Sequence, residues 1–333
     1  MKITLFGTQP YDRESFDRIR DAYGFDVTYH RSHLNAVNVA LAEGADVVCI
    51  FVNDTADAAT VARLSQLGVR LIALRCAGFN NVDLLSAAQH GIPVVRVPAY
   101  SPHAVAEHAV ALMLSLNRKI HRAYWRTRDG NFSLHGLLGF DLYGKTAGIV
   151  GTGRIARELI RILRGFGMEV IAYDLCPDEA YAAAAGIAYV PLDELYARAD
   201  IVSLHCPLTD RTRYMIGPEA IGRMKPGVML INTGRGQLIH TGALIDGLKQ
   251  KKIGAAGLDV YEEEAAYFYE DTSDRIMGDD VLARLLSFNN VIVTSHQGFF
   301  TREALDNIAR TTMENIREFA AGEPLTNRVS AGA

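Results

Sequence analysis

The feature that most constrains this chain is a repeated alternation of short apolar runs with longer helical patterns. Nine runs are rich in β-branched residues and almost continuously apolar, which is typical of parallel strands covered on both faces. They are KITLFG (2–7), DVVCIF (46–51), LIALRC (71–76), TAGIVG (146–151), EVIAYD (169–174), DIVSLH (200–205), VMLINT (228–233), AAGLDV (255–260) and VIVTSH (291–296). Between them lie stretches such as 154–166 with apolar residues at helical spacing. The alternation predicts βαβ units and a doubly wound α/β fold.

Length and composition narrow the possible classes of protein. A chain of 333 residues favours two domains over one, and an apolar share of 49% is that of a folded protein. The 38 acidic and 34 basic residues give a net charge of -4, which favours neither nucleic acid nor an anionic membrane as a partner. No apolar run approaches the roughly 20 residues of a spanning helix, so we expect no membrane segment.

Cysteine and histidine spacing gives no sign of a metal site. The four cysteines are Cys49, Cys76, Cys176 and Cys206. They form no C-x-x-C pair, which argues against zinc and favours a reducing compartment. His103 and His108 stand five apart and do not share a helix face well. The apolar stretch at the N-terminus is too short for a signal peptide. We therefore expect a cytoplasmic protein without a metal.

Two segments interrupt the alternation of predicted strands and helices. Residues 105–124 read as one long helix, placed after VPAYSP (97–102) where it would suit a connector between domains, and residues 125–145 have no clean period. Residues 262–280 hold eight acids, one basic residue and three aromatic residues, a pattern typical of a solvated loop. The last helical pattern, 302–321, ends at AAGEP, where glycine and proline are stop signals.

The segment VGTGRIA (150–156) follows a predicted strand and opens a predicted helix. In this setting Gly151 permits a tight turn, and Gly153 lets the backbone approach a pyrophosphate. The first-turn amides, at Arg154 and Ile155, would then bind the phosphates with the helix dipole. Ala156 stands at the third position of the fingerprint, where glycine is more common.

Asp174 supplies the second half of this fingerprint. It closes the next strand 23 residues after Gly151, where a carboxylate would accept hydrogen bonds from the adenosine ribose. Its alternative role is that of a simple strand-end cap. A carboxylate repels a 2′-phosphate, and residues 175–177 contain no arginine. The sequence therefore favours NAD over NADP.

Ligands in open α/β sheets bind outside the carboxyl ends of the strands. The polar residues just past the predicted strand ends after the glycine turn are Asp174, His205 with Cys206 and Pro207, Thr233 to Gly236, Asp259 and His296. Arg235 could hold a carboxylate and a carbonyl oxygen with one planar guanidinium. His296 could exchange a proton near neutral pH, and a carboxylate beside it would orient the ring.

Each of these residues has a structural alternative. Arg235 could form a surface salt bridge, and His296 could be a structural histidine at a strand end. Glu262, Glu263 and Glu264 would ordinarily be a solvated acidic run. Spacing alone does not bring Glu264 to His296, so the residues by themselves give only a hypothesis of hydride chemistry on a small acid.

The same residues carry a family likeness. NTGRG (232–236), GLDVYEEE (257–264) and TSHQGF (294–299) resemble the signature segments of the NAD-dependent D-2-hydroxyacid dehydrogenases. LRCAGFNNVD (74–83), VPAYSPHAVAEHAV (97–110), HRAYWRTRDGNFSLHGL (121–137), FDLYGKTAGIVGTG (140–153) and IVSLHCPLT (201–209) are most similar to the bacterial fermentative D-lactate dehydrogenases within that family. The resemblance covers nearly the whole chain. Two departures are Ala156 and Ser295, which stands where many members have proline.

The resemblance implies a catalytic set and a reaction. Arg235 would bind the carboxylate and carbonyl of the substrate, His296 would be the acid and base, and Glu264, five residues after Asp259, would pair with His296. The implied reaction is the reversible reduction of pyruvate to D-lactate by NADH. Another small 2-oxo acid is an alternative substrate. A dinucleotide-sensing binding protein is a further alternative, which the complete Arg–Glu–His set disfavours.

The resemblance also assigns binding residues. On the substrate side, the amides of Cys76, Ala77 and Gly78 would receive the carboxylate, with Tyr100 and Phe299 as pocket walls. On the cofactor side, the implied residues are Gly151, Gly153, Arg154, Ile155, Asp174, His205, Cys206, Pro207, Thr233, Gly234 and Asp259. Asp259 would contact the nicotinamide carboxamide, and His205, Cys206 and Pro207 would flank the adenosine.

Finally, the resemblance implies a domain arrangement. A discontinuous flavodoxin-like substrate domain would comprise 1–102 and 299–333, and a Rossmann NAD domain would comprise 103–298. A homo-oligomer, dimer or tetramer, is expected through the 105–145 region.

Overall fold

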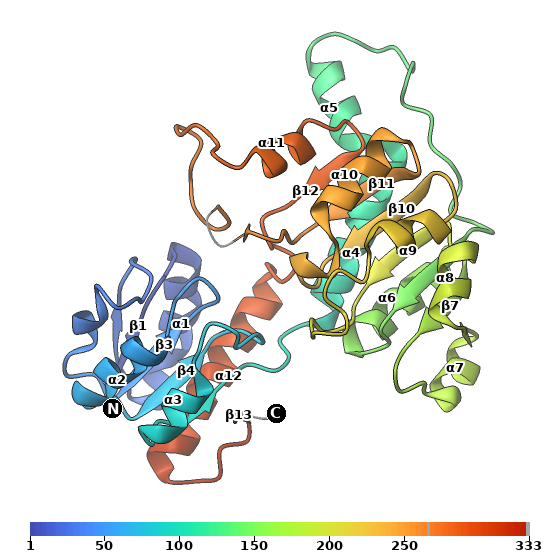
Figure 1. The fold of residues 1–333 in the computed structure, drawn as a ribbon. Coiled ribbons are helices and arrows are strands. Elements are labelled where there is room, and N and C mark those ends of the chain that lie inside the picture. The colour runs from blue at the N-terminus through green and yellow to red at the C-terminus, as the bar shows by residue number, and fades with distance from the viewer. Residues whose placement is uncertain (265–266, 331–333) are drawn as a thin grey trace. The chain divides into compact units, whose positions relative to one another are not determined.

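The computed structural model describes residues 1–264 and 267–330, and the chain folds into two compact units (Figure 1). Unit 1 is built from Met1–Ser101 and from the chain that begins again at Phe299. Unit 2 is the continuous segment Pro102–Gly298. The boundary predicted after residue 102 lies one residue earlier, because Pro102 already is the first residue of a helix.

Unit 1 contains a six-stranded sheet of order β13-β5-β4-β3-β1-β2. Its strands are β1 (Lys2–Leu5), β2 (Asp26–Tyr29), β3 (Val47–Ile50), β4 (Leu71–Leu74), β5 (Val94–Val95) and β13 (Arg328–Val329). The first five are parallel in the order 2-1-3-4-5, which is that of the flavodoxin-like folds. β13 adds an antiparallel edge strand from the C-terminal part of the chain.

Helices cover both faces of this sheet. One face packs against α1 (Pro10–Tyr23) and α12 (Arg302–Ala321), and the other against η1 (Val39–Ala42), α2 (Ala58–Gln66) and α3 (Leu84–Gln89). The predicted C-terminal helix over 302–321 has these bounds in the structure. It begins at Thr301, whose hydroxyl accepts the N–H of Ala304, and it ends at Gly322 in the left-handed conformation.

Unit 2 contains a seven-stranded parallel sheet of order β12-β11-β10-β9-β6-β7-β8. Its strands are β6 (Thr146–Val150), β7 (Glu169–Tyr173), β8 (Ala188–Tyr189), β9 (Ile201–Leu204), β10 (Val228–Asn232), β11 (Ile253–Leu258) and β12 (Val291–Val293). Counted from β6, six of them follow the order 3-2-1-4-5-6 of a dinucleotide-binding Rossmann fold. The doubly wound α/β prediction is confirmed for both units.

Two helical layers enclose this second sheet (Figure 1). One layer consists of α4 (Pro102–Arg118), α6 (Arg154–Gly165) and α7 (Glu179–Ala185). The opposite layer consists of α8 (Leu192–Arg198), α9 (Pro218–Arg223), α10 (Thr241–Lys249) and α11 (Asp280–Leu286). Because both faces are covered, the central strands are buried along their length, which explains their continuous apolar runs.

The predicted single helix over 105–124 is wrong. The structure has two helices, α4 and then α5 (Ile120–Arg128), separated by Lys119 in the left-handed conformation at φ 51°. The buried Asn117 side chain exchanges two hydrogen bonds with the backbone of Phe140, at 2.7 and 2.8 Å. The Lys119 ammonium binds the carbonyl of Leu138. The helix therefore breaks where the later segment returns to it, a contact that helical spacing does not reveal.

All nine predicted strands are present, whereas β2, β5, β8 and β13 were not predicted. Three of these four have only two residues, and β2, β8 and β13 lie at sheet edges. Short or half-exposed strands lack the continuous apolar run that marks the central ones. Within the residues that the structure describes, no helix has the length and apolarity needed to cross a membrane.

A glycine in β6 tests the packing of this fold. A Cβ on Gly148 would lie 2.6 Å from Cδ2 of Leu195 and 2.9 Å from Cβ of Ala199, both on or next to α8. We expect Gly148→Val to lower the free energy of unfolding by about 1–3 kcal/mol through overpacking. The matched control is Gly165→Ala at the end of α6, where a Cβ meets open space. Denaturant unfolding of both variants measures the effect, and equal stabilities would contradict the prediction.

Candidate active site

The carboxyl ends of the parallel strands in unit 2 gather most of the predicted site residues at one edge of the sheet. Strand by strand from β6, these residues are Gly151 after β6, Asp174 after β7, His205 after β9, Thr233 to Arg235 after β10, Asp259 after β11 and His296 after β12. Residues that are up to 145 positions apart in the chain thus share one edge, as parallel pairing requires.

The glycine turn forms a close-approach site. Gly151 has φ 89°, and a Cβ there would lie 2.7 Å from the backbone N of Cys206 and 2.8 Å from the carbonyl carbon of His205. Gly153 is the N-cap of α6, and its surroundings are open, so a Cβ would meet nothing within 4 Å. Only glycine fits the first position, and the second leaves space where a pyrophosphate would approach the helix N-terminus.

The next three residues, 154–156, form the start of α6, as the sequence predicts. Arg154 is the first residue of α6 and is exposed, and Ile155 is partly buried against the core. Ala156 is fully buried against the sheet. A methyl group is therefore accommodated where the fingerprint more often has glycine.

Asp174 stabilises this turn from the neighbouring strand. Its carboxylate accepts hydrogen bonds from the N–H of Thr152 at 2.7 Å, the hydroxyl of Thr152 at 2.8 Å and the N–H of Cys176 at 3.0 Å. Burial alone would raise the pKa of Asp174, but these hydrogen bonds outweigh it and hold the pKa below its usual value. The alternative role of Asp174 as a strand-end cap is thus observed, and the carboxylate keeps a negative charge at the end of β7.

After β9 the chain presents a neutral histidine and an unreactive thiol. Nε2 of His205 lies 2.8 Å from the hydroxyl of the buried Ser203, and burial lowers the pKa of this histidine to about 4. Burial raises the pKa of the Cys206 thiol to about 11, and its sulfur contacts that of Met215 at 3.6 Å. Pro207 receives the hydroxyl of Thr212 on its carbonyl. These residues offer a wall of low polarity, suited to an adenosine.

The loop after β10 holds Arg235 in a defined position. The buried Asn232 side chain donates to the carbonyl of Arg235 at 2.9 Å and accepts the N–H of Gly234 at 3.0 Å. A Cβ on Gly236 would lie 2.1 Å from backbone atoms of Tyr261, so the loop passes directly against the next strand end. Among the described residues, no carboxylate forms an ion pair with Arg235, so the surface salt bridge is not observed there. Its guanidinium binds only the carbonyl of Gly234 among these residues.

Thr233 carries an orphaned buried oxygen. Its side chain is 7% exposed, and Oγ1 has no hydrogen-bond partner within the part of the chain that the structure describes. A buried hydroxyl of this kind is costly unless a ligand satisfies it. Together with the open turn at Gly153 and the carboxylate of Asp174, this oxygen fits the binding of a dinucleotide along the sheet edge.

The structure brings His296 and Glu264 together. Nδ1 of His296 lies 2.8 Å from Oε1 of Glu264, and the two side chains are 18% and 24% exposed. The other oxygen of Glu264 accepts the N–H of Tyr261 at 3.0 Å, which fixes the carboxylate. Of the neighbouring acids, Glu262 accepts the N–H of Thr241 and does not reach the histidine. A carboxylate thus orients the imidazole and leaves Nε2 for a substrate, which is the geometry of a proton donor.

Two aromatic residues that the sequence analysis missed lie beside predicted ones. Tyr269 donates its hydroxyl to the carbonyl of His296 at 3.0 Å and stacks on its ring. Its position inside an acidic loop gives no sequence signal for this contact. In unit 1 the Phe51 ring lies 6.0 Å from that of Phe299. Phe51 is an apolar residue inside the predicted strand 46–51, so a rule that selects polar residues after strand ends does not find it.

The predicted substrate loop of unit 1 follows β4. The sulfur of Cys76 contacts the carbonyl of Gly78 at 3.2 Å, and Arg96 donates to the carbonyl of Ala77 at 2.9 Å. The N–H groups of Ala77 and Gly78 have no acceptor among the described residues, and are thus available to an anion. The walls predicted for the pocket are in contact, since the rings of Tyr100 and Phe299 lie 6.0 Å apart.

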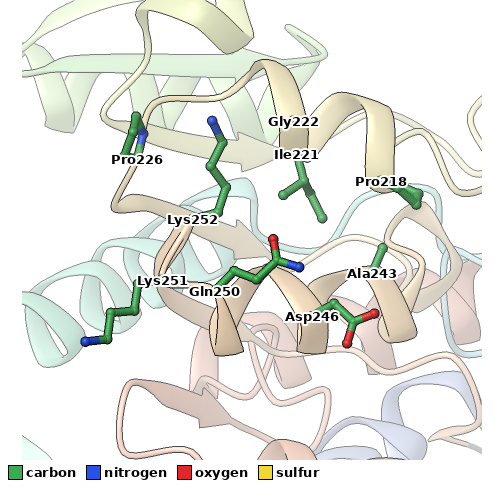
Figure 2. Close-up of a pocket in the computed structure, with 10 residues that line it drawn as sticks. Pro218, Ile221, Gly222, Pro226, Ala243, Asp246, Gln250, Lys251 and Lys252 are labelled. Atoms are coloured by element: carbon green, nitrogen blue, oxygen red, sulfur yellow. The ribbon is translucent and has the colours of Figure 1, made fainter.

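Unit 2 also has a pocket at the opposite edge of its sheet (Figure 2). Its volume is about 570 Å³, and its lining includes Ile221 of α9, Asp246 of α10, and Lys251 and Lys252 just before β11. Because it lies at the amino ends of the strands, it is separate from the site described above. No group of three or more potential metal ligands occurs within residues 1–264 and 267–330.

The lowered pKa of the partly buried His205 predicts a dependence of stability on pH. The unfolded chain binds a proton at this histidine near pH 6.5, whereas the folded chain does so only near pH 4. Stability should therefore decrease as the pH falls through this window, by up to about 3 kcal/mol from this residue.

His205→Gln removes the titrating group and keeps an amide near the position of Nε2. We expect the stability of the variant, measured by denaturant unfolding between pH 7 and pH 4.5, to change less with pH than that of the wild type. Parallel stability curves for the two proteins would show that His205 is not held neutral.

Comparison with known proteins identifies the family. A family model described as D-isomer specific 2-hydroxyacid dehydrogenase, NAD binding domain, matches residues 110–298. The chain is 51% identical over 329 residues to a 2-hydroxyacid dehydrogenase homolog of Haemophilus influenzae, which covers 99% of both chains. It is 47% identical over 329 residues to the D-lactate dehydrogenase of Escherichia coli, covering 99% of this chain and 100% of that one.

Among solved structures, the pyruvate reductase of Chlamydomonas reinhardtii is similar, with a TM-score of 0.93 at 47% identity over 98% of each chain. The family match confirms the predicted cofactor, NAD, and the matched residues 110–298 lie within unit 2. The chain belongs to the D-isomer specific 2-hydroxyacid dehydrogenase family.

Proposed function

We propose that this protein is a D-lactate dehydrogenase that reduces pyruvate to D-lactate with NADH, a reversible reaction that reoxidises the cofactor. The observation that carries this proposal is the pair of His296 and Glu264, 2.8 Å apart at the cofactor edge of unit 2. The name of the Escherichia coli relative and that of the Chlamydomonas structure, a pyruvate reductase, support the substrate.

Arg235 binds the substrate in this proposal. Its backbone is fixed by the Asn232 side chain, and its guanidinium forms no ion pair with a carboxylate among the described residues. A planar fork of donors can hold the substrate carboxylate and its keto oxygen at once. In unit 1, the resemblance implies that the N–H groups of Ala77 and Gly78, which have no acceptor among the described residues, would bind a carboxylate.

Bound NADH supplies the hydride that is added to the keto carbon. His296 donates a proton from Nε2 to the keto oxygen while Glu264 holds Nδ1, so that the imidazole keeps one orientation through the transfer. Arg235 stabilises the negative charge that develops on this oxygen. In the reverse direction His296 accepts the proton of the hydroxyl group.

The cofactor residues divide by strand end. Asp174 would accept the adenosine ribose hydroxyls, and the turn at Gly151 and Gly153 with the amides of Arg154 and Ile155 would bind the pyrophosphate. His205, Cys206 and Pro207 would line the adenosine, and Thr233, Gly234 and Asp259 the nicotinamide side. Both carboxylate oxygens of Asp259 are engaged by other groups of unit 2, so any contact of Asp259 with the nicotinamide would be a shared one.

The substrate is expected to be small. In unit 1 the rings of Phe51, Tyr100 and Phe299 form one aromatic group. The resemblance implies Tyr100 and Phe299 as pocket walls, and such large side chains would favour pyruvate over a branched or aromatic 2-oxo acid.

A substitution at the proposed acid tests the mechanism. We expect His296→Ala to lower kcat/KM for pyruvate by about 10²–10⁴-fold, because the proton donor is lost. NADH binding, measured by fluorescence titration, should stay within about twofold. His90→Ala, an exposed histidine of unit 1, is the control and should leave turnover unchanged. Wild-type turnover in the His296→Ala variant would disprove the assignment.

The choice of substrate is measured by the loss of NADH absorbance. We expect rapid loss with pyruvate and at least tenfold lower kcat/KM with phenylpyruvate or 2-oxoisocaproate, because the aromatic group is bulky. Reaction with the larger acids alone would identify a different 2-hydroxyacid dehydrogenase. No reaction with any of them, while NADH still binds, would favour a dinucleotide-sensing protein.

We also propose that two copies of the chain associate through α5 and the segment that follows it. This helix has no buried residue, and it projects from unit 2 with residues 129–145 (Figure 1). The large apolar side chains exposed there are Ile120, Tyr124, Trp125, Phe132, Leu134, Leu138, Phe140 and Tyr143. So many exposed apolar groups in one short segment are typical of a homo-oligomer interface.

This interface is tested by a charge placed within it. We expect Trp125→Glu to lower the mass measured by light scattering from that of a dimer or tetramer toward that of a monomer of 36.5 kDa. Val37→Glu is the control, because Val37 is also an exposed apolar residue but lies in unit 1. A wild-type protein of monomer mass would remove the basis of the proposal.

We also propose that the protein is located in the cytoplasm. No disulfide joins the four cysteines, all of which lie within the described residues. A protein whose thiols stay reduced suits a reducing compartment, in which NADH is also available.

A further inference from the structure

His108 of α4 connects three elements that are distant in sequence. Its Nε2 atom lies 3.1 Å from the hydroxyl of Thr294, which follows β12, and 3.3 Å from Oδ1 of Asp259, which follows β11. The His108 side chain is 16% exposed and that of Asp259 is 1% exposed. This histidine shows no metal-ligand spacing, and the mechanism proposed above does not use it.

The carboxylate that His108 contacts organises the chain around His296. Asp259 accepts the hydroxyl of Thr294 at 2.6 Å and the N–H groups of Gln297 and Gly298, each at 2.8 Å. The backbone carbonyl of Asp259 accepts the N–H of His296 at 2.7 Å. One residue therefore holds the backbone on both sides of the proposed proton donor.

These hydrogen bonds to Asp259 are needed because the backbone of His296 is strained. Its φ of 51° lies in the left-handed region, which is unfavourable for a non-glycine residue. The packing beside it is tight, since a Cβ on Gly298 would lie 2.9 Å from Oδ2 of Asp259 and 3.5 Å from Cδ2 of His108. Such a conformation persists only where its surroundings fix it.

The Asp259 carboxylate in turn depends on its partners. Burial raises its pKa, but the hydrogen bonds from His108 and Thr294 outweigh burial, and the resulting pKa lies below the usual value. An ionised carboxylate this deeply buried would be left poorly compensated if the imidazole were removed. Its grip on residues 297 and 298 would then loosen.

We propose that His108 is a positioning residue for the reaction: it fixes the Asp259 carboxylate, which holds residues 294–298 in the conformation that presents His296 to Glu264 and to the substrate. The effect on turnover rests on the function proposed above, whereas the effect on residues 294–298 does not.

Two substitutions separate the hydrogen bond from the packing. His108→Leu keeps much of the volume and removes the donor, and His108→Gln places an amide nitrogen near the position of Nε2. We expect His108→Leu to lower kcat about 10–100-fold with a smaller change in the KM for pyruvate, as for residues that orient a catalytic group. His108→Gln should recover at least a third of the wild-type kcat.

The primary isotope effect on kcat gives a second kinetic readout. With NADH deuterated at the transferred hydrogen, the effect should rise in His108→Leu, because a displaced proton donor makes the chemical step slower than product release. The control on the same helix is His103→Leu. His103 pairs with Glu158 at the surface, and its loss should change none of these values.

A readout without turnover uses the protein free of cofactor. In hydrogen–deuterium exchange we expect faster exchange of the peptide covering residues 294–298 in His108→Leu, at wild-type rates elsewhere, and near wild-type exchange in His108→Gln. If His108→Leu does not fold, Thr294→Val removes another hydrogen-bond donor of Asp259 and should give the same local change.

The outcomes decide between the two proposals. Wild-type kcat and wild-type exchange in His108→Leu would overturn the positioning role, as would faster exchange spread evenly over the whole chain. Equal losses in His108→Leu and His108→Gln would also overturn it, since the amide donor would then not matter. If the wild type reduces no 2-oxo acid, the proposed function fails, and the exchange measurement alone still tests the positioning role.

Discussion

Parallel pairing in the seven-stranded sheet of unit 2 brings the carboxyl ends of its strands to one edge, and the chemistry of the molecule depends on that edge. Each of its central strands is covered by helices on both faces, so the polar residues that follow the strands are the first groups able to meet a ligand. Gly151 shows how closely the strand ends approach one another, because a single added carbon would touch the backbone of Cys206. The position of the site is thus set first by the common direction of the parallel strands, and the individual side chains then determine its chemistry.

Three carboxylates fix the backbone at this edge of the sheet. Asp174 binds the turn at Thr152, Glu264 binds the N–H of Tyr261 as well as the imidazole of His296, and Asp259 binds the segment that carries His296. In each case a negative charge near the sheet edge is stabilised by hydrogen bonds from the backbone, which makes it directional. The proposed proton donor His296 is therefore held in place by carboxylates that also bind the backbone.

Much of the architecture was readable from the sequence, for a physical reason. A strand buried on both faces must be apolar at almost every position, so the central strands of both sheets stood out without any knowledge of their neighbours. The short edge strands β8 and β13 did not, because two residues carry no pattern. The break at Lys119 was also hidden, since it lies where Asn117 pairs with Phe140, which is 23 positions later in the chain.

The sequence by itself determined the strand–helix alternation, the glycine turn with Asp174, and the identity of the residues placed at the strand ends, because each of these follows from local pattern and spacing. The family resemblance implied that Glu264 pairs with His296, but only the tertiary structure showed the contact itself, with Glu262 bound elsewhere. It also showed that Arg235 has no ion pair with a carboxylate of the described residues. It also decided that His108, 151 residues before Asp259, contacts its carboxylate. Distances between residues far apart in a chain are set by strand order and helix packing, and no local pattern encodes them.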